Sequence, residues 1–593
     1  MKRFNFIPLF LFIFSITINA QTASKKPVKQ CNGMLARQLV EQQAEISKTI
    51  EETDKRVNVL IKVADFLWIQ DEESARRYFA EAFQIAQDRF REKGLEKAES
   101  KGVTLSKPDY RFEVVRAVAR RDAEWAKKLS ETILKEFEEN KETDKRSDFD
   151  RNKEVQQLLG IAASVAKDNP DLALSFARRV MRYPLSNSWH YNLFQMAGNN
   201  QPLANSIYAE LLNNYADAEV FRLLYLSAYP FGRDRIFGIE KFTLGTWVPP
   251  NFAPNPNLQR QFLQTLFRRT LKLTPENTGK SLQTKTPESA VAIIALNELE
   301  PLIAQQFPDL MPMFNQAKIH ANSIVTNEIL DSANARNEVG KNFGKSFEEK
   351  IKELEKADAD GKLKDAQIVG MIFSAVKEED YKLAETWLDK IQSETGREST
   401  ANYFYFQRSK VATKDKRFDD ARKYAEKVSK IEHRAILYFD IAEEKIKNEA
   451  TKYASLDELL EVYKLAEKAP DSVEKAQIFL GLANIYEKIN HSNALDAISN
   501  AVRTVNKLKN PNLFSTFLGQ QIAVEGSLVI ASYDVPGFDL NKTFYEISQK
   551  DFQGALVEAD NFTDKYLRTL AVLAVVKDCE KNDKPVKPPP KKK

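Results

Sequence analysis

Small and apolar residues recur along the chain with the spacing of one helical face, and most of these runs follow an Asp or Asn. The clearest copy has Asp71, then Ala75 four positions later, with Phe79 and Ala82 four and seven positions beyond Ala75. Residues at positions i, i+4 and i+7 lie on one face of an α-helix. An Asp or Asn just before a helix accepts its first backbone N–H bonds. The pattern therefore predicts a turn followed by an amphipathic helix.

The same register occurs eight more times. Six further copies keep the Asp or Asn: Asp122 with Ala126 and Ile133, Asn169 with Ala173, Ala177 and Val180, Asn200 with Ala204, Tyr208 and Leu211, Asp380 with Ala384, Leu388 and Ile391, Asn490 with Ala494, Ile498 and Ala501, and Asp551 with Ala555, Ala559 and Phe562. Two copies keep only the helix: Ala421 with Ala425 and Val428, and Leu459 with Tyr463 and Ala466.

A second apolar segment lies just upstream of most copies, so each unit is predicted to be a helical hairpin. Leu60, Val63, Ala64 and Leu67 precede Asp71, and Leu482, Ala483 and Tyr486 precede Asn490. From Ala384 the anchor residues are separated by 37, 38 and 35 residues, which is the period of stacked helical hairpins. The earlier steps, from Ala75 onward, are 51, 47 and 31 residues, so the first repeats have longer loops or helices.

The Ala75, Phe79 and Ala82 spacing resembles the second-helix signature of the tetratricopeptide repeat (TPR) family, and Ala494, Ile498 and Ala501 match it more loosely. The resemblance covers about two thirds of the mature chain in degenerate form. It implies an all-α fold, namely an α-solenoid of TPR-like helical hairpins that winds into a right-handed superhelix with a concave binding face. The spacing by itself indicates only paired helices.

Two regions interrupt the repeats and divide the predicted solenoid into two arrays. Five prolines and several aromatic residues between Pro230 and Asn257 prevent a continuous helix. A charged stretch at Asn337 to Leu363 separates the second array, with a boundary near Gly340 to Lys345. The predicted organisation is a signal peptide at 1–20, a linker at 21–34, N-terminal repeats at 35–215, an irregular aromatic and Pro-rich insertion at 216–257, a helical connector at 258–345, C-terminal TPR-like repeats at 346–510, a C-terminal helical cap at 511–580 and a disordered Lys/Pro tail at 581–593.

The amino terminus predicts export. Lys2 and Arg3 precede an apolar stretch from Phe4 to Ile18, and Ala20 is a small residue suited to signal-peptidase cleavage. The apolar stretch is shorter than the roughly 20 residues that a spanning helix needs. We therefore expect a cleaved signal peptide and a periplasmic or secreted protein, without a transmembrane segment after cleavage.

Composition and charge narrow the function classes. Only 19 of 593 residues are glycine, which argues against nucleotide-binding α/β folds. The net charge of +4 comes from interspersed charges, so nucleic acid is not an expected partner. The lysines of the 581–593 tail favour a solubilising role over weak contact with anionic envelope polymers.

The two cysteines, Cys31 and Cys579, lie at opposite ends of the mature chain. A disulfide between them requires the Cα atoms to come within about 7 Å of each other. An open superhelix keeps its ends apart. The sequence therefore favours two unpaired thiols, with a disulfide as the alternative.

Motifs for catalysis, cofactors and metals are not matched. No glycine lies in a phosphate-binding loop, and the four histidines, His190, His320, His433 and His491, are far apart in the sequence. Asp358 and Asp360 resemble the centre of a calcium loop, but Lys356 and Gln367 replace two of its acidic ligands, so a plain interhelical loop is the simpler interpretation. We name no catalytic, cofactor-binding or metal-binding residue and expect no cofactor.

The 216–257 insertion contains the candidate binding residues Arg233, Arg235, Phe237, Phe242, Trp247 and Phe252. Long loops are often functional, and aromatic and arginine side chains could stack on a peptide or a sugar. The simpler alternative is that these aromatic residues pack against the neighbouring helices.

These observations predict a non-enzymatic scaffold that binds a protein or peptide partner in the cell envelope. A glycan-acting envelope enzyme with a helical superstructure is one alternative, and a purely structural envelope component is another. The expected binding surface is the concave face, with a contribution from the insertion.

Overall fold

The structure is a computed structural model that describes residues 31–94, 97–100, 103–106, 109–139, 148–234, 236–237, 247–275, 287–325, 347–513, 517–524 and 527–579. The predicted signal peptide, most of the linker and the Lys/Pro tail lie outside these residues, as do Arg235 and Phe242.

The N-terminal half contains helices that pair in chain order. Their bounds are α1 (Gly33–Ser47), α2 (Thr53–Leu67), α3 (Glu72–Lys93), α4 (Tyr110–Ala119), α5 (Ala123–Glu139), α6 (Asp148–Val165), α7 (Pro170–Val180) and α8 (Ser188–Asn214). Helix α2 packs on α3, α4 on α5, and α6 on α7. Helix α8 contains a kink at Asn200, whose φ and ψ of −158° and 87° split it into two helical segments.

The middle of the chain is irregular and then helical. Its elements are α9 (Val220–Leu223), the 3-10 helices η1 (Leu224–Leu226) and η2 (Tyr229–Phe231), α10 (Pro256–Leu271), α11 (Glu288–Gln306), η4 (Pro308–Leu310) and α12 (Met311–Ser323). Helices α10 and α11 both pack against α12.

The C-terminal half is a second series of hairpins. Its elements are α14 (Phe347–Ala359), α15 (Asp365–Lys377), α16 (Tyr381–Leu388), α17 (Glu394–Lys414), α18 (Phe418–Glu426), α19 (Ile431–Ile446), η6 (Tyr453–Ser455), α20 (Leu456–Lys468), α21 (Val473–Tyr486), α22 (His491–Val505), η7 (Pro536–Phe538), α23 (Leu540–Ser548), α24 (Phe552–Asp560) and α25 (Lys565–Val576). Successive helices pair as α15 with α16, α17 with α18, α19 with α20, α21 with α22 and α23 with α24.

The predicted repeat register is confirmed residue by residue. Each Asp or Asn of the seven capped copies accepts a hydrogen bond from the backbone N–H three residues later, as Asp71 does from Ser74 at 3.0 Å and Asn490 from Asn493 at 3.3 Å. The anchor residues of all nine copies, such as Ala75 and Leu459, are fully buried. The fold is therefore helical hairpins that stack by burying an anchor residue, alanine in all copies but one, at each helix contact.

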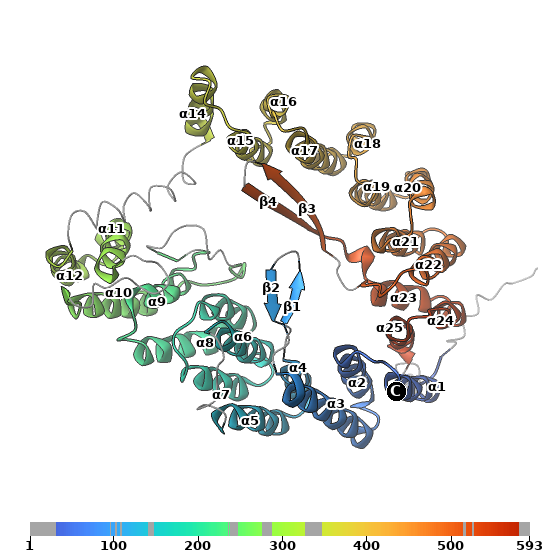
Figure 1. Cartoon of the computed structure of the whole chain (residues 1–593), viewed down its shortest axis with the longest axis horizontal. Helices are drawn as coiled ribbons and strands as arrows, with labels where there is room; N and C mark the ends of the chain where they lie inside the picture. Colours follow the sequence, from blue (N-terminus) through green and yellow to red (C-terminus); the bar gives the residue numbers. More distant parts are fainter. Residues whose placement is uncertain are drawn as a thin grey trace, which may run out of the picture.

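The hairpins form two rows that curve together (Figure 1). One helix of each hairpin contacts its counterpart in the next hairpin, giving an inner row of α2, α4, α6 and α8 and another of α15, α17, α19, α21, α23 and α25. Helices α5, α7, α16, α18, α20, α22 and α24 lie on the outer rim. Together these two sets of helices form the inner row, which is the concave face that the TPR resemblance implies.

The first and last helices of the array meet, which corrects the expectation of separated array ends and unpaired thiols. A disulfide joins Cys31 and Cys579, whose Cα atoms are 5.3 Å apart. Helix α25 packs on α1 and α2, where Thr569 Oγ1 donates a hydrogen bond to Gln43 Oε1 at 3.0 Å. The curvature of the array brings α25 back onto α1, so the described helices trace most of a ring (Figure 1).

Two β-hairpins were not expected from the sequence. Strands β1 (Lys97–Ser100) and β2 (Val103–Ser106) pair antiparallel, as do β3 (Phe517–Val524) and β4 (Ser527–Asp534). The second hairpin lies where the sequence predicted the helical cap. Its two short apolar runs flank a Glu-Gly turn sequence. Strand β3 lies on α17, where Gln520 Nε2 donates to the Ser399 carbonyl at 3.1 Å.

Among the described residues, no helix is both long and apolar enough to cross a bilayer.

Candidate binding groove on the inner row

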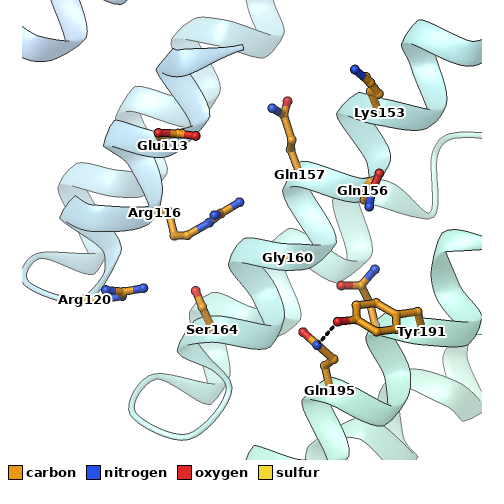
Figure 2. Close-up of a pocket in the computed structure, with 11 residues that line it drawn as sticks. Glu113, Arg116, Arg120, Lys153, Gln156, Gln157, Gly160, Ser164, Tyr191 and Gln195 are labelled. Atoms are coloured by element: carbon orange, nitrogen blue, oxygen red, sulfur yellow. Dashed lines mark hydrogen bonds between the residues drawn. The ribbon is translucent and has the colours of Figure 1, made fainter. Parts of the chain in front are cut away.

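A polar pocket of about 500 Å³ lies between α4, α6 and α8 on the inner row. Each of the three helices contributes side chains to its lining (Figure 2). The lining residues are Glu113, Arg116, Arg120, Lys153, Gln156, Gln157, Gly160, Ser164, Tyr191, Asn192 and Gln195. We call this pocket the inner groove.

Helix α4 supplies a charged stripe to the inner groove. Glu113, Arg116 and Arg120 follow one another at steps of three and four residues, so they lie on one face of the helix. Its opposite face is buried in the core through Val114, Val115 and Val118. The same amphipathic pattern that stacks the helix thus turns these charges toward the groove.

Glu113 and Arg116 interact electrostatically at the groove wall. Burial raises the pKa of Glu113 above its usual range, and the positive charge of Arg116 opposes that rise. The Nε atom of Arg116 is buried, and it has no hydrogen-bond partner within the described part of the chain. This guanidinium therefore keeps hydrogen-bonding capacity that the fold does not use.

Helix α6 forms the floor of the groove. Lys153, Gln156, Gln157, Gly160 and Ser164 share one helical face. At Gly160 a side chain would enter the space beside Arg116, because a Cβ built there lies 3.6 Å from Arg116 Nη2. The absence of a side chain at this position keeps the floor of the groove open.

Helix α8 forms the far wall with a partly exposed aromatic ring. Tyr191 is 48% exposed, and Gln195 Nε2 donates a hydrogen bond to its hydroxyl oxygen (Figure 2). Asn192 is buried and donates from Nδ2 to the Ser188 carbonyl at 2.8 Å. The groove thus combines two guanidinium groups, a lysine, several primary amides and an aromatic surface, with Glu113 as the carboxylate among its lining residues.

Two of the candidate aromatic residues of the insertion pack inside the protein. Phe237 is 1% exposed, lies 5.4 Å from Phe231 between ring centroids, and has the Arg233 guanidinium 3.9 Å above its ring. Phe252 lies against Phe194 and Tyr229 at centroid distances of 5.1 and 5.2 Å. Arg233 also pairs with Glu298 at 3.5 Å. These contacts hold the insertion on the helices.

Among the described aromatic residues of this set Trp247 is the exposed one, and the loop that carries it is fixed to α8. Its side chain is 59% exposed. Gln201 of α8 donates from Nε2 to the Ala253 carbonyl at 2.6 Å and accepts from the Ala253 N–H at 3.2 Å. The ring of Phe252 covers Gly232, which has a φ of 63°, and a Cβ built at Gly232 would lie 3.1 Å from that ring, which is a tight contact.

Trp247 lies on the same face of α8 as the groove. A Cβ built at Gly198 would be 3.8 Å from Trp247 Cζ3 and 3.5 Å from Pro249. Tyr191, Gln195 and Gly198 are spaced by four and three residues, so they share one helical face. The Trp247 ring therefore extends the groove wall by about one helical turn, or roughly 5 Å.

The other sequence motifs lie away from the groove or serve packing. The four histidines are on four helices, α8, α12, α19 and α22. Asp358 lies near the end of α14, pairs with Lys390 at 2.5 Å, and precedes a turn in which Gly361 has a φ of 66°.

Sequence reasoning missed the lining residues of the inner groove. They are polar residues of ordinary helices, and their clustering depends on how three hairpins stack. The available signal is the polar stripe on each first helix together with Gly160, a helix-interior glycine in a glycine-poor chain.

Comparisons with known proteins add little to the geometry. No protein-family model and no curated protein matches the chain. Among solved structures, the chain is similar to a circular tandem repeat protein with novel repeat topology and enhanced subunit contact surfaces, at 12% identity over 93% of this chain and 97% of that one, with a TM-score of 0.19. It is also similar to yeast Tom70, at 10% identity over 93% of this chain and 96% of that one, with a TM-score of 0.21.

TM-scores this low carry no argument about function, so the class of protein rests on the helix pairs themselves. The capped, stacked hairpins define a helical repeat protein with an all-α solenoid architecture, interrupted by two short β-hairpins.

Proposed function

We propose that this chain is an exported interaction scaffold that holds a segment of a partner protein in the inner groove of α4, α6 and α8. One observation carries the proposal: charged and amide side chains from three successive hairpins converge on this one groove. Stacked hairpins offer a long rigid surface at little conformational cost, which suits recognition of extended polypeptides.

Two features support export. The amino-terminal sequence has the basic, apolar and small-residue order of a cleaved signal peptide. The disulfide between Cys31 and Cys579 is of a kind that persists in oxidising compartments such as the periplasm or the extracellular space.

The lining of the groove favours a binding role over glycan hydrolysis. Glycoside hydrolases generally use two carboxylates that flank the scissile bond. Among the residues that line this groove, Glu113 is the carboxylate and its neighbours are cationic or amides. That set suits recognition through hydrogen bonds and charge.

The test is affinity purification of the tagged full-length chain from its native source after chemical cross-linking. Gly160→Leu fills the groove floor without changing charge. Gly370→Leu is the matched control, because Gly370 also lies inside a helix and has no atom within 4 Å of the added Cβ. We expect specific partners to be captured by the wild type and by Gly370→Leu and to be lost with Gly160→Leu. Capture of the same partners by all three proteins would overturn the proposal, provided that circular dichroism shows equal folding.

A further inference from the structure

The chemistry of the inner groove indicates which kind of partner segment it takes. We propose that the groove binds an acidic stretch of polypeptide, with a carboxylate held by Arg116 and Arg120 and an apolar side chain of the same stretch placed on Trp247. This inference rests on the proposed function and specifies its ligand.

The charge balance of the groove favours an anionic group. The cationic side chains of Arg116 and Arg120 line the groove together with one carboxylate, Glu113. Because burial raises the pKa of Glu113, its negative charge is disfavoured at the site. Within the described part of the chain the Arg120 side chain is exposed and has no ion-pair partner.

The hydrogen-bonding geometry favours a carboxylate over a simple point of negative charge. A guanidinium offers a planar fork of N–H donors that matches the two oxygens of a carboxylate. Arg116 is half-buried and lines the groove, so a bound carboxylate would meet a guanidinium that is already partly desolvated. Arg120, the C-cap residue of α4, lies one helical turn from Arg116.

The other two helices favour a polypeptide as the carrier of that carboxylate. Gln156 and Gln157 of α6 present primary amides, which can both donate to and accept from a peptide backbone. Beyond Gln195, the exposed Trp247 ring supplies an apolar surface about three extended residues away from Tyr191. An acidic residue followed at a short interval by an apolar one fits this order of groups.

The direct test is fluorescence anisotropy of the purified full-length chain with synthetic peptides. The probe is the labelled octapeptide Gly-Asp-Glu-Gly-Leu-Asp-Glu-Gly, and its partner replaces each acid by the isosteric amide. We expect the acidic peptide to bind at least about tenfold more tightly than the amide peptide, because the amide peptide lacks the negative member of each charge pair. Added salt should weaken the binding of the acidic peptide.

Charge-neutral variants locate the binding. A triple variant should reduce affinity for the acidic peptide by about tenfold or more. It combines Arg116→Gln, Arg120→Gln and Lys153→Gln. The matched control combines Lys382→Gln, Lys423→Gln and Lys464→Gln, which removes the same charge from the outer helices α16, α18 and α20. Trp247→Ala should weaken the binding of the leucine-containing peptide. It should leave the affinity for a peptide with glycine in place of leucine unchanged.

Each outcome decides between the two proposals. Equal affinity of the wild type for the acidic and amide peptides would overturn this inference. An equal loss of affinity for the acidic peptide in the groove variant and in the control variant would overturn it as well. Tight binding of trigalacturonic acid, an acidic oligosaccharide, in preference to the acidic peptide would overturn it in favour of a glycan. If cross-linked partners still depend on Gly160 while the acidic peptide fails to bind, the scaffold proposal stands and only its ligand class is wrong.

Discussion

Most buried ionisable side chains in this protein are paired, and His433 is an exception. Arg111 is fully buried between Asp109 and Glu136, with Nη2 of Arg111 2.6 Å from Asp109 and Nη1 2.6 Å from Glu136. His433 of α19 is 1% exposed, and neither ring nitrogen has a hydrogen-bond partner within the described residues. Its ring lies instead edge-on to Phe406 and Tyr533, at 6.0 and 6.4 Å between centroids.

This environment makes His433 a source of acid sensitivity. Burial, with a smaller contribution from the charge of Lys430, lowers the pKa of His433 from 6.5 to about 4. Between these values the unfolded chain binds a proton that the folded protein does not, so the free energy of unfolding falls as pH falls. At about 1.4 kcal/mol per pKa unit, the loss is about 3 kcal/mol from neutral pH down to pH ~4.

The variant His433→Phe should remove that sensitivity. A phenyl ring fits the same edge-on contacts and brings no unsatisfied nitrogen into the core, so stability at neutral pH should be equal or higher. Thermal melting from about pH 7 to about pH 4 should give a smaller decrease in Tm for the variant than for the wild type. Parallel decreases in the two proteins would contradict the assignment of this effect to His433.

At the scale of elements, the distance between packed helices depends on the positions of glycine and alanine at their contacts. Gly481 of α21 lies against the ring of Phe439 on α19, and a Cβ built there would be only 2.5 Å from Phe439 Cε2. Phe439 is itself buried, so its ring has little room to move. The small residue sets the distance between these two inner helices.

Gly481→Ala should therefore destabilise the protein, against the usual trend. Alanine normally stabilises a helix interior by about 1 kcal/mol relative to glycine. Here the added methyl overpacks a filled contact, at a cost of about 1–3 kcal/mol. Gly370→Ala of α15, where no atom lies within 4 Å, should follow the normal trend and raise Tm. The measurement is thermal unfolding of both variants, and an increase of Tm in both would refute this account of the α19–α21 contact.

The elements that the sequence predicts are those specified by nearby residues. Asp71 and Asn490 cap helices that begin at the next residue, and Ala75 and Ala494 are buried one turn further on, so short-range spacing was sufficient to find them. The hairpin of β3 and β4 was missed because its apolar runs resemble short buried helix segments, and only its packing on α17 distinguishes them.

The candidate site was predicted only in part, for the same reason. Trp247 was singled out by composition, whereas Arg116 and Gly160 are single residues on two helices that the stacking of hairpins brings together. Phe237, which the sequence grouped with Trp247, is buried against Phe231. Aromatic residues in a loop do not reveal from sequence alone which of them the core takes up.

At the scale of the whole molecule, the contact between the first and last helices of the array turns a row of hairpins into a closed structure at that point. Helix α25 meets α1 and α2, where Tyr566 Oη donates to Asn58 Oδ1 at 3.1 Å beside the hydrogen bond between Thr569 and Gln43. Helix α2 also contacts α4, which carries Glu113 of the inner groove. The groove therefore adjoins the junction that closes the chain.

The disulfide between Cys31 and Cys579 should control how firmly this junction holds. It closes a loop with a sequence separation of 548 residues. The chain-entropy model gives such a long loop a stabilisation of about 6 kcal/mol as an upper limit. In a stacked array each hairpin contacts only its neighbours, so without the bond the end helices can separate while the rest of the array stays folded.

Reduction should therefore lower Tm and increase the radius of gyration measured by small-angle X-ray scattering. The double variant Cys31→Ser and Cys579→Ser should behave like the reduced wild type and should not respond to reductant. Oxidised and reduced proteins with the same Tm and the same radius of gyration would mean that the α1–α25 contact alone holds the ends together.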